Sequence, residues 1–425
     1  MPHGRSLSLR RPTQAVILAG GRGTRLWPLT DTRPKPMVEI LGKPFLEYQI
    51  EQLREQGFER VLVLLGYLPE VVQNYFGDGC RWGIAIEYSV TAVEDETARR
   101  VKLAEPYLDS CFLLMYCDNY WPMQIDRMWQ KFHASGAPAM ITVYANRDGY
   151  TRNSVRVEPD GWVSLYDKSC SHPDLNGVEI SYGILRREVV ERLTEENLLF
   201  ETTVYPALAE RKELIAFVTD HRYYSVGAHH RLPLTAEFFK RRKTVILDRD
   251  GVLNRKPPRA HYVRSWNDFA WLPGAQTALR QLNESGYRVI VVSNQAGIAR
   301  GAMTEAALSD IHQRMKREAW LAGGEIEAIY YCAHDWDAGC DCRKPSPGML
   351  FQAQRDLHLD LSRTLFIGDD ERDSEAADRA GCLFLQVSEE KPLIECVQSL
   401  VSRESTDESK EGIENHAKTG LNHRA

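Results

Sequence analysis

Short apolar runs alternate along this chain with segments that have helical spacing. In the first half, three runs predict buried strands and two segments predict amphipathic helices: Ala15–Ala19, Val61–Leu65 and Cys111–Cys117 for the strands, Leu46–Phe58 and Glu70–Phe76 for the helices. A regular alternation of this kind is typical of an α/β fold, in which helices cover both faces of a mostly parallel sheet. The pattern predicts a doubly wound α/β domain in the first half.

In the second half, the apolar runs end in polar residues. Strands expected at Val245–Leu247, Tyr287–Val292 and Thr364–Ile367 lead into Asp248, Ser293 and Asp369, and helices are expected from Pro273 and from a cap at Thr304. The C-terminal ends of parallel strands meet at one edge of a sheet, where α/β folds bind ligands. We therefore predict a second doubly wound parallel sheet, with these polar residues at that edge.

The 425 residues suffice for two or three domains. A helix expected at Leu234–Phe239 is followed by the basic run Lys240–Lys243, which leads directly into the next strand without a Gly/Ser-rich linker. We place one domain at residues 14–240 and another at 244–401. Residues 1–13 are expected to form a frayed basic leader, and the polar residues 402–425 a disordered tail.

Composition limits the kinds of partner. The net charge of −6 gives no overall attraction to nucleic acid, and no apolar run approaches the ~20 residues needed to span a bilayer. The run Ala15–Ala19 is too short for the core of a signal peptide. We expect a cytoplasmic protein with no nucleic-acid or membrane partner, and the sequence leaves its oligomeric state open.

Two features predict metal ions. Asp248 and Asp250 are so close that their carboxylates repel unless a cation neutralises them, and oxygen ligands favour Mg²⁺. Three thiols and an imidazole lie within one short segment and match a tetrahedral structural zinc site: Cys332, His334, Cys340 and Cys342. The alternative is three unrelated thiols beside a surface histidine. The other six cysteines are expected to be reduced core thiols.

A glycine-rich loop follows the first strand and could bring backbone N–H groups close to phosphate oxygens. Together with Pro34-Lys-Pro36, this loop resembles the signature of the sugar-1-phosphate nucleotidyltransferases over residues 14–240. The resemblance implies nucleotide binding by Gly20, Gly21, Gly23 and Thr24, catalysis by Arg25 and Lys35, and Mg²⁺ binding by Asp118. It also implies that Asp167-Lys168, Gly183 and Glu201 contact the sugar phosphate.

Two positions depart from that family's pattern. Ser225 stands where the family has a second metal-binding aspartate, and Asp95–Arg100 replaces its glycine-rich segment at the nucleobase. Loss of a carboxylate weakens Mg²⁺ binding, and loss of glycines closes the space for a base. Two interpretations stay open: a working transferase, or a degenerate module that binds a sugar nucleotide.

The second half resembles the haloacid-dehalogenase-like phosphatases. The resemblance implies that Asp248 is the nucleophile, that Asp250 is the general acid and base, and that Ser293 and Lys344 hold the phosphoryl group. It makes Asp248, Asp369 and the Asp250 carbonyl Mg²⁺ ligands, with Asp373 orienting Lys344 or the metal's water shell. Asn294, Arg300 and Arg343 are expected to bind the substrate.

Within that group, the cysteine and histidine motif is most similar to the zinc-containing heptose bisphosphate and histidinol phosphate phosphatases. The fusion favours heptose, because D-glycero-D-manno-heptose 1,7-bisphosphate would lose its C7 phosphate to give heptose 1-phosphate, a transferase substrate. The nucleoside triphosphate is expected to be GTP, from resemblance to heptose-1-phosphate guanylyltransferases, and the end product a surface polysaccharide precursor. Histidinol phosphate stays an alternative; the zinc motif and acidic charge count against a polynucleotide 3′-phosphatase.

Overall fold

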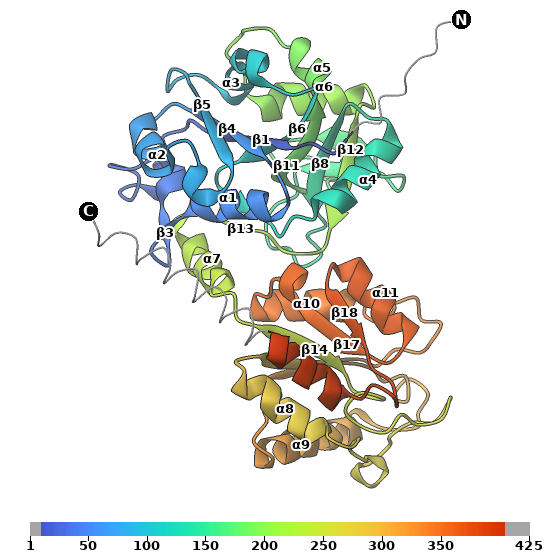
Figure 1. Cartoon of the computed structure of the whole chain (residues 1–425). Coiled ribbons are helices and arrows are strands. Elements are labelled where there is room, and N and C mark those ends of the chain that lie inside the picture. The colour runs from blue at the N-terminus through green and yellow to red at the C-terminus, as the bar shows by residue number, and fades with distance from the viewer. Residues whose placement is uncertain (1–9, 404–425) are drawn as a thin grey trace, which may run out of the picture. The chain divides into compact units, whose positions relative to one another are not determined.

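The computed structural model describes residues 10–403, which form parts of two compact units, Met1–Lys240 and Arg241–Ala425 (Figure 1). The tail expected over 402–425 lies almost entirely outside the described residues, as do residues 1–9 of the expected leader. The rest of that leader packs on the first unit. Pro12 is buried, and the Thr13 carbonyl accepts hydrogen bonds from the backbone N–H groups of Glu59 and Arg60.

The first unit is built on a seven-stranded sheet with the order β12-β8-β11-β6-β1-β4-β5. Its strands are β1 (Gln14–Ala19), β4 (Arg60–Leu65), β5 (Ala85–Val90), β6 (Cys111–Tyr116), β8 (Ala139–Tyr144), β11 (Val178–Arg186) and β12 (Leu214–Thr219). Neighbouring strands are parallel except that β11 runs antiparallel to β6 and β8. The sheet is mixed because a hairpin, β9 (Val155–Val157) and β10 (Val163–Tyr166), precedes β11 in place of a crossover helix.

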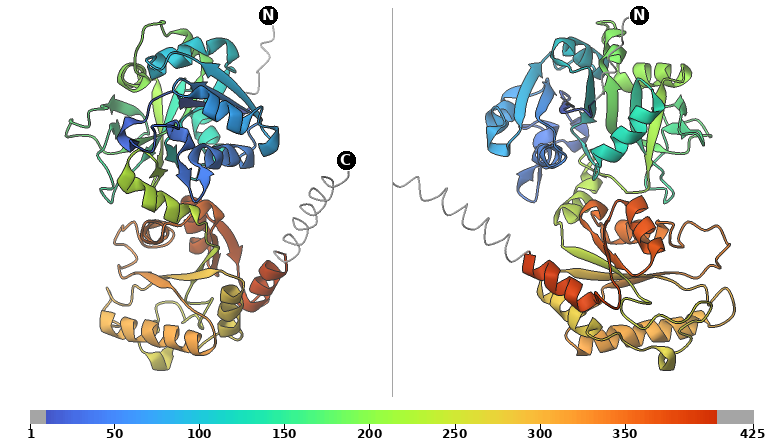
Figure 2. Two further views of the ribbon diagram at one scale, coloured as in Figure 1. Left: turned by 90° about the vertical axis from the view of Figure 1, so that its left-hand side faces the viewer. Right: turned by 45° about the vertical axis from the view of Figure 1, so that its right-hand side comes forward.

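Helices cover both faces of this sheet (Figure 2). Alternate residues of β1 point to opposite sides, so that Ile17 packs in one core and Val16 in the other. The Ile17 side carries α1 (Phe45–Glu55), α2 (Pro69–Phe76) and α4 (Ile125–Ser135); the Val16 side carries α3 (Thr97–Leu103), α5 (Arg187–Glu191) and α6 (Tyr205–Glu210).

A smaller core closes the first unit. Helix α7 (Leu232–Phe239) places Phe238 against Tyr224, with ring centroids 4.0 Å apart. Tyr224 belongs to one of two short strand pairs: β13 (Tyr224–Ser225) with β7 (Asn119–Tyr120), and β2 (Glu39–Ile40) with β3 (Lys43–Pro44). The β13–β7 pair fixes Ser225 opposite Asn119, next to the end of β6.

The second unit has a five-stranded sheet with the order β16-β15-β14-β17-β18, and all its strands are parallel, as the sequence predicted for this sheet. Its strands are β14 (Thr244–Asp248), β15 (Arg288–Asn294), β16 (Ala328–Cys332), β17 (Leu365–Gly368) and β18 (Leu383–Gln386). Helices α8 (Ala275–Glu284) and α9 (Glu305–Leu321) cover one face with the helix at residues 393–403, and α10 (Gly348–Leu357) and α11 (Glu371–Ala380) cover the other (Figure 1).

Both sheets reverse their strand order beside the first strand of the unit. From β14 the chain moves to β15 and β16, and then returns to β17 on the other side of β14. In the first unit it moves from β1 to β4 and β5, and then returns to β6. Such reversals open a crevice at the C-terminal ends of the strands. None of the helices within residues 10–403 is both long and apolar enough to cross a membrane.

Candidate active sites and metal centre

A cavity of about 620 Å³ lies at the crevice of the second unit. Eight residues that the sequence selected line it: Asp248, Asp250, Ser293, Asn294, Arg343, Lys344, Asp369 and Asp373. They come from the ends of β14, β15 and β17 and from the loop before α10. The topology has therefore brought residues more than 100 positions apart to one edge of the sheet.

Lys344 lies at the centre of this group. Its ammonium nitrogen is 2.7 Å from Asp248 Oδ1 and 2.6 Å from Asp373 Oδ1, and its side chain is only 4% exposed. Burial would lower the pKa of Lys344, but the two carboxylates raise it above its usual value. Lys344 is therefore a fixed cation at the rim of β14.

The side chain of Asn294 holds Lys344 in place. Its amide nitrogen donates to the Lys344 carbonyl, and its oxygen accepts from the Lys344 backbone N–H, both at 3.1 Å. The sequence predicted a substrate contact for Asn294. The structure directs its amide to the Lys344 backbone, so Asn294 positions the lysine.

Three carboxylates in the cavity fit a hard cation. Oxygens of Asp248, Asp369 and Asp373 all lie within 4.8 Å of one another. Burial, followed by the charges of Asp373 and Asp250, raises the pKa of Asp248 to about 7 although Lys344 opposes it. In the described part of the chain, the buried Oδ1 of Asp369 has no hydrogen-bond partner. These oxygens are the donor set that Mg²⁺ takes.

A glycine makes the approach of Asp369 possible. Gly251 has a φ of 104°, and a Cβ at this position would lie 2.2 Å from Asp369 Oδ2. Any larger residue would therefore push the carboxylate out of the cavity.

Asp250 is held by three donors and does not belong to the three-carboxylate group. Arg249 Nη2 lies 2.9 Å from each of its oxygens, and the amides of Asn254 and Gln295 each donate to it at 2.9 Å. Burial would raise the pKa of Asp250, but the charge of Arg249 and these hydrogen bonds hold it below the usual value. Arg249 is fully buried and lies 3.3 Å from His312 Nε2. The sequence analysis did not select Arg249, which lies between the two aspartates, because alternate residues of an extended strand point to opposite sides.

Arg300, for which the sequence predicted a substrate contact, is not among the residues that line the cavity. Its guanidinium pairs with Asp335 at 2.6 Å and stacks on the ring of Trp336, 3.6 Å from the centroid. Trp336 itself lines the cavity, as do other residues that the sequence did not select: Lys256, Arg259, Gln295 and Arg372. Two of these belong to the Pro- and Arg-rich segment 255–267, whose composition was the available signal.

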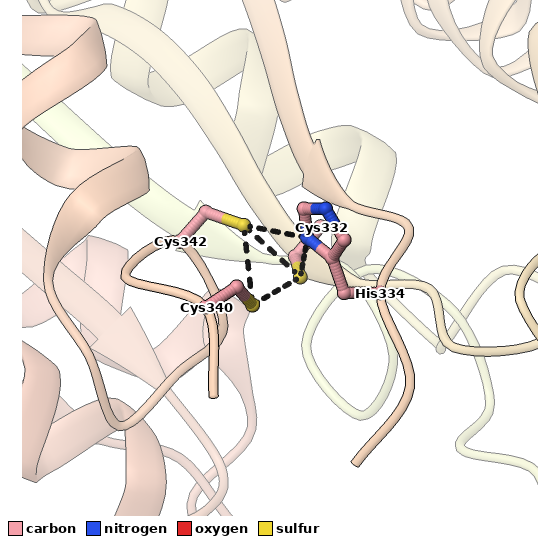
Figure 3. Close-up of side chains that lie close together, drawn as sticks. All are labelled: Cys332, His334, Cys340 and Cys342. Atoms are coloured by element: carbon pink, nitrogen blue, oxygen red, sulfur yellow. Dashed lines mark hydrogen bonds between the residues drawn. The ribbon is translucent and has the colours of Figure 1, made fainter. Parts of the chain in front are cut away.

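The segment after β16 brings three thiols and one imidazole together (Figure 3). Cys332 Sγ lies 3.6 Å from Cys340 Sγ and 3.2 Å from Cys342 Sγ, and Cys340 and Cys342 are 3.5 Å apart. His334 Nδ1 lies 3.6 Å from Cys332 Sγ and 3.1 Å from Cys342 Sγ. Zn–S bonds of about 2.3 Å at tetrahedral angles separate sulfurs by about 3.8 Å, so the cluster has nearly the size of a zinc site.

The chemistry of the cluster also fits a divalent metal. Burial, followed by hydrogen bonds with the neighbouring thiols, raises the pKa of Cys342, and burial raises that of Cys332. Without a metal ion, the buried thiolates of Cys332 and Cys342 lack a compensating positive charge. A metal ion supplies that charge and takes the thiolates as ligands.

The first unit has its own cavity, of about 380 Å³, at the ends of β1 and β6. Eight predicted residues line it: Gly20, Gly21, Gly23, Thr24, Arg25, Lys35, Asp118 and Glu201. Lys35 Nζ lies 2.5 Å from Asp118 Oδ2. Burial would raise the pKa of Asp118, but Lys35 and then Arg25 lower it below the usual value. This cavity thus has glycine-rich backbone, and the two cations Arg25 and Lys35 hold Asp118 as an ionised carboxylate.

Three residues expected at the sugar phosphate lie outside the wall of this cavity. Gly183 pairs inside the sheet with Leu114 and Ile141. Asp167 accepts hydrogen bonds from the backbone N–H groups of the turn that follows it, at 2.9–3.0 Å. Lys168 is mostly exposed, with its nitrogen 3.9 Å from Glu201 Oε1.

The bend in β11 falls on Ser181 and not on Gly183. Ser181 has a φ of 73°, and the register of β11 against β8 shifts between Glu179 and Gly183. Asn119 Nδ2 donates to Ser181 Oγ at 2.8 Å. A serine in a conformation that glycine favours gave no signal in the sequence.

The two departures from the transferase pattern both lie at this cavity. Ser225 pairs with Asn119, the residue after Asp118, and a Cβ on Gly227 would lie 3.7 Å from Ser225 Oγ and 3.9 Å from Asp118 Oδ2, so the side chains of Ser225 and Asp118 both border Gly227. Arg100 is buried, and a Cβ on Gly20 would lie 2.3 Å from its guanidinium carbon. That guanidinium donates to four acceptors: Leu65 O, Thr91 Oγ1, Ala92 O and Val93 O. Arg100 therefore fills space next to the glycine-rich loop.

Two protein families match the chain. The family described as nucleotidyl transferase matches residues 14–152, and the family described as polynucleotide kinase 3 phosphatase matches residues 243–393. Each match falls within one unit and includes residues of its cavity. The fold and the two sites thus define a nucleotidyltransferase domain joined to a phosphatase domain, as the sequence predicted.

Curated relatives specify the second family further. The chain is 41% identical over 140 residues to the D-glycero-beta-D-manno-heptose-1,7-bisphosphate 7-phosphatase of Bordetella bronchiseptica, a match that covers 33% of this chain and 77% of the relative. The protein of that name from Pseudomonas aeruginosa is 41% identical over 141 residues, covering 33% and 78%. The chain belongs to the family of D-glycero-beta-D-manno-heptose-1,7-bisphosphate 7-phosphatases.

Solved structures resemble each part of the chain. The D,D-heptose 1,7-bisphosphate phosphatase of B. bronchiseptica, complexed with magnesium and phosphate, is 34% identical with a TM-score of 0.36, covering 38% of this chain and 99% of that one. HddC from Yersinia pseudotuberculosis is 25% identical with a TM-score of 0.45, covering 53% of this chain and 99% of that one.

Proposed function

We propose that this protein catalyses two consecutive reactions of nucleotide-activated heptose synthesis. The second unit removes the C7 phosphate of D-glycero-D-manno-heptose 1,7-bisphosphate, and the first transfers a nucleotidyl group to the heptose 1-phosphate that results. The observation that carries the proposal is the buried Asp248–Lys344–Asp373 group in a phosphatase-family cavity, on one chain with a nucleotidyltransferase domain.

In the phosphatase step, a carboxylate oxygen of Asp248 attacks phosphorus as the bond to the C7 oxygen breaks, which gives an aspartyl-phosphate. The negative charge of the bound substrate favours protonation of Asp250, which then donates this proton to the leaving oxygen. Asp250 then takes a proton from water, which attacks the aspartyl-phosphate, releases inorganic phosphate and regenerates Asp248. Lys344 and the hydroxyl of Ser293 hold the phosphoryl oxygens.

The residues present fit Mg²⁺ in this cavity and Zn²⁺ at the cysteine cluster. Asp248 and Asp369 would hold Mg²⁺, which would neutralise the negative charge of the phosphoryl group. The zinc would be structural and would fix the loop that leads from Cys342 to Arg343 and Lys344. Asp118 would hold Mg²⁺ in the first unit. We propose that the protein acts in the cytoplasm, where sugar phosphates and nucleoside triphosphates are available.

The substrate of the phosphatase is tested by inorganic phosphate release. We expect kcat/KM for D-glycero-D-manno-heptose 1,7-bisphosphate to exceed that for histidinol phosphate and for a 3′-phosphorylated oligonucleotide by orders of magnitude, and Asp248→Asn to abolish release. Preference for either of the other two substrates would overturn the heptose assignment, and parental activity of Asp248→Asn would overturn the aspartyl-phosphate.

In the transferase step, the glycine-rich loop and Arg25 would hold the triphosphate, and Lys35 would stabilise the negative charge as heptose 1-phosphate attacks the α-phosphorus. Pyrophosphate leaves as the P–O bond to it breaks. We propose GTP as the nucleotide donor. Pyrophosphate release with heptose 1-phosphate and each of GTP, CTP, UTP and ATP tests this, with Lys35→Ala as the inactive control.

A second candidate keeps the phosphatase and makes the first unit a binding module without catalysis. Two observations favour it: Ser225 lies near Asp118 where a second carboxylate was expected, and Arg100 occupies space beside Gly20. Pyrophosphate release with any of the four triphosphates excludes this candidate. Binding of a nucleotide sugar without any pyrophosphate release would support it.

A further inference from the structure

We infer that Trp336 is a substrate-binding platform of the phosphatase, on which the sugar ring of the phosphorylated substrate stacks. This inference rests on the proposed function of the second unit and specifies how that site selects its substrate. It assigns the role to a residue inside the cysteine loop, between His334 and Cys340.

The position of Trp336 is the first observation. Its side chain lines the same cavity as Asp248 and Asp250, yet the residue is 43% exposed. The exposed part of the indole is therefore open to a ligand in this cavity. A ligand bound at Asp248 would remove part of this apolar surface from water, which favours binding.

The support of the indole ring is the second observation. Arg300 stacks on the ring, 3.6 Å from its centroid, and its Nε donates to Asp335 Oδ1 at 2.6 Å. The same carboxylate oxygen accepts from the Trp336 backbone N–H at 2.7 Å. Arg300 and Asp335 thus hold the ring from one side in a fixed orientation, as a cation–π pair does. Little side-chain freedom is left to lose when a substrate binds.

The chemistry of the rest of the cavity determines the ligand class. Most other side chains of the wall are charged or polar, among them Lys256, Arg259, Arg343 and Arg372. Such groups bind phosphate and hydroxyl oxygens but offer no surface to the C–H face of a sugar ring. The indole supplies that surface, together with the ring of Tyr262, which lines the same wall. The site therefore fits a cyclic, polyhydroxylated phosphomonoester better than an acyclic one.

The test compares a cyclic and an acyclic substrate. For Trp336→Ala, we expect KM for D-glycero-D-manno-heptose 1,7-bisphosphate to rise about tenfold while kcat stays within twofold of the parent. Hydrolysis of glycerol 3-phosphate, which has no ring, should have the same kcat/KM in both proteins. Trp336→Phe should restore most of the lost affinity for heptose bisphosphate. Trp320→Ala is the matched control, since Trp320 is 69% exposed on α9 and does not line the cavity.

Metal content and thermal unfolding separate this role from a structural one. Trp336→Ala should keep the zinc content and Tm of the parent. An unchanged KM for heptose bisphosphate in Trp336→Ala, with an active parent, would overturn the platform alone. Equal losses on both substrates would overturn it too, because they indicate damage to the shared phosphoryl site. A parent that hydrolyses glycerol 3-phosphate but no sugar bisphosphate would instead refute the proposed function.

Discussion

The ammonium nitrogen of Lys344 lies 2.7 Å from Asp248 Oδ1, and both residues are buried at the end of β14. The same nitrogen reaches Asp373 at 2.6 Å, so one cation compensates two buried carboxylates. Each carboxylate would be costly to bury without it. Catalysis and folding therefore depend on the same contact.

The first prediction is that replacement of Lys344 reduces both the phosphatase activity and the stability of the protein. For Lys344→Met, we expect loss of phosphate release and a decrease of about 3–5 kcal/mol in the free energy of unfolding, since two buried charges lose their partner. Urea denaturation of the metal-free protein measures the second effect. Lys256→Met is the control: Lys256 is 44% exposed and pairs with Asp369, so its loss should cost less than about 1 kcal/mol. Equal effects of the two substitutions would contradict the role of Lys344.

The second prediction concerns pH and His312. Burial, followed by the charge of Arg249, lowers the pKa of His312 to about 3. The unfolded state, with an ordinary histidine pKa, binds a proton near pH 6.5 and the folded state does not. The contribution of His312 to stability is thus complete above pH 6.5 and is lost as pH falls toward 3.

Between pH 7.5 and 5, the parent should therefore lose about 2 kcal/mol that His312→Gln retains. Urea denaturation at a series of pH values measures the difference. His133→Gln, at the exposed end of α4 in the other unit, should leave the pH dependence unchanged. Parallel profiles for the parent and His312→Gln would show that His312 is protonated in the folded protein.

The third prediction concerns the cysteine cluster. Cys340→Ser removes one of the four ligands, and we expect the purified protein to lose one zinc ion per chain by elemental analysis. Loss of about 3 kcal/mol of metal-linked stability would lower Tm by about 6–12 °C. Phosphate release should also fall, because Lys344 is two residues from Cys342. Cys80→Ser, an exposed cysteine of the first unit, should change none of these. Unchanged metal content in Cys340→Ser would exclude the site.

The sequence predicted the cavity residues that follow strands. Asp248, Ser293 and Asp369 come at the ends of apolar runs. Parallel strands place such residues at one edge of the sheet, independently of the conformation of the connecting loops. The cysteine cluster could also be predicted, because its four residues lie within an 11-residue segment. Side chains so close in sequence can meet at one metal ion whatever the tertiary structure.

Residues whose role depends on packing could not be predicted in this way. Arg300 was expected at the substrate because of its charge. Its guanidinium instead donates to Asp335 and stacks on Trp336, and no sequence pattern indicates a contact between residues 35 positions apart. Ser181 has a left-handed backbone conformation, and its hydroxyl accepts a hydrogen bond from Asn119, which is 62 positions away in the sequence. Each outcome was decided by a contact between distant elements.

The fourth prediction tests the missing carboxylate of the first unit. Ser225 is buried, lies on β13 opposite Asn119, and is close to Asp118. Ser225→Asp would supply the aspartate that the transferase family has at this position, and the charges of Arg25 and Lys35 would help to keep it and Asp118 ionised. We expect this protein to bind Mg²⁺ about tenfold more tightly in the presence of GTP and to release pyrophosphate faster at limiting Mg²⁺. Ser225→Asn, which has the same shape without the charge, should show neither gain. If Ser225→Asp slows pyrophosphate release at every Mg²⁺ concentration while Ser225→Asn does not, the serine is suited to a single-carboxylate site and the family pattern is no guide to the metal in this chain.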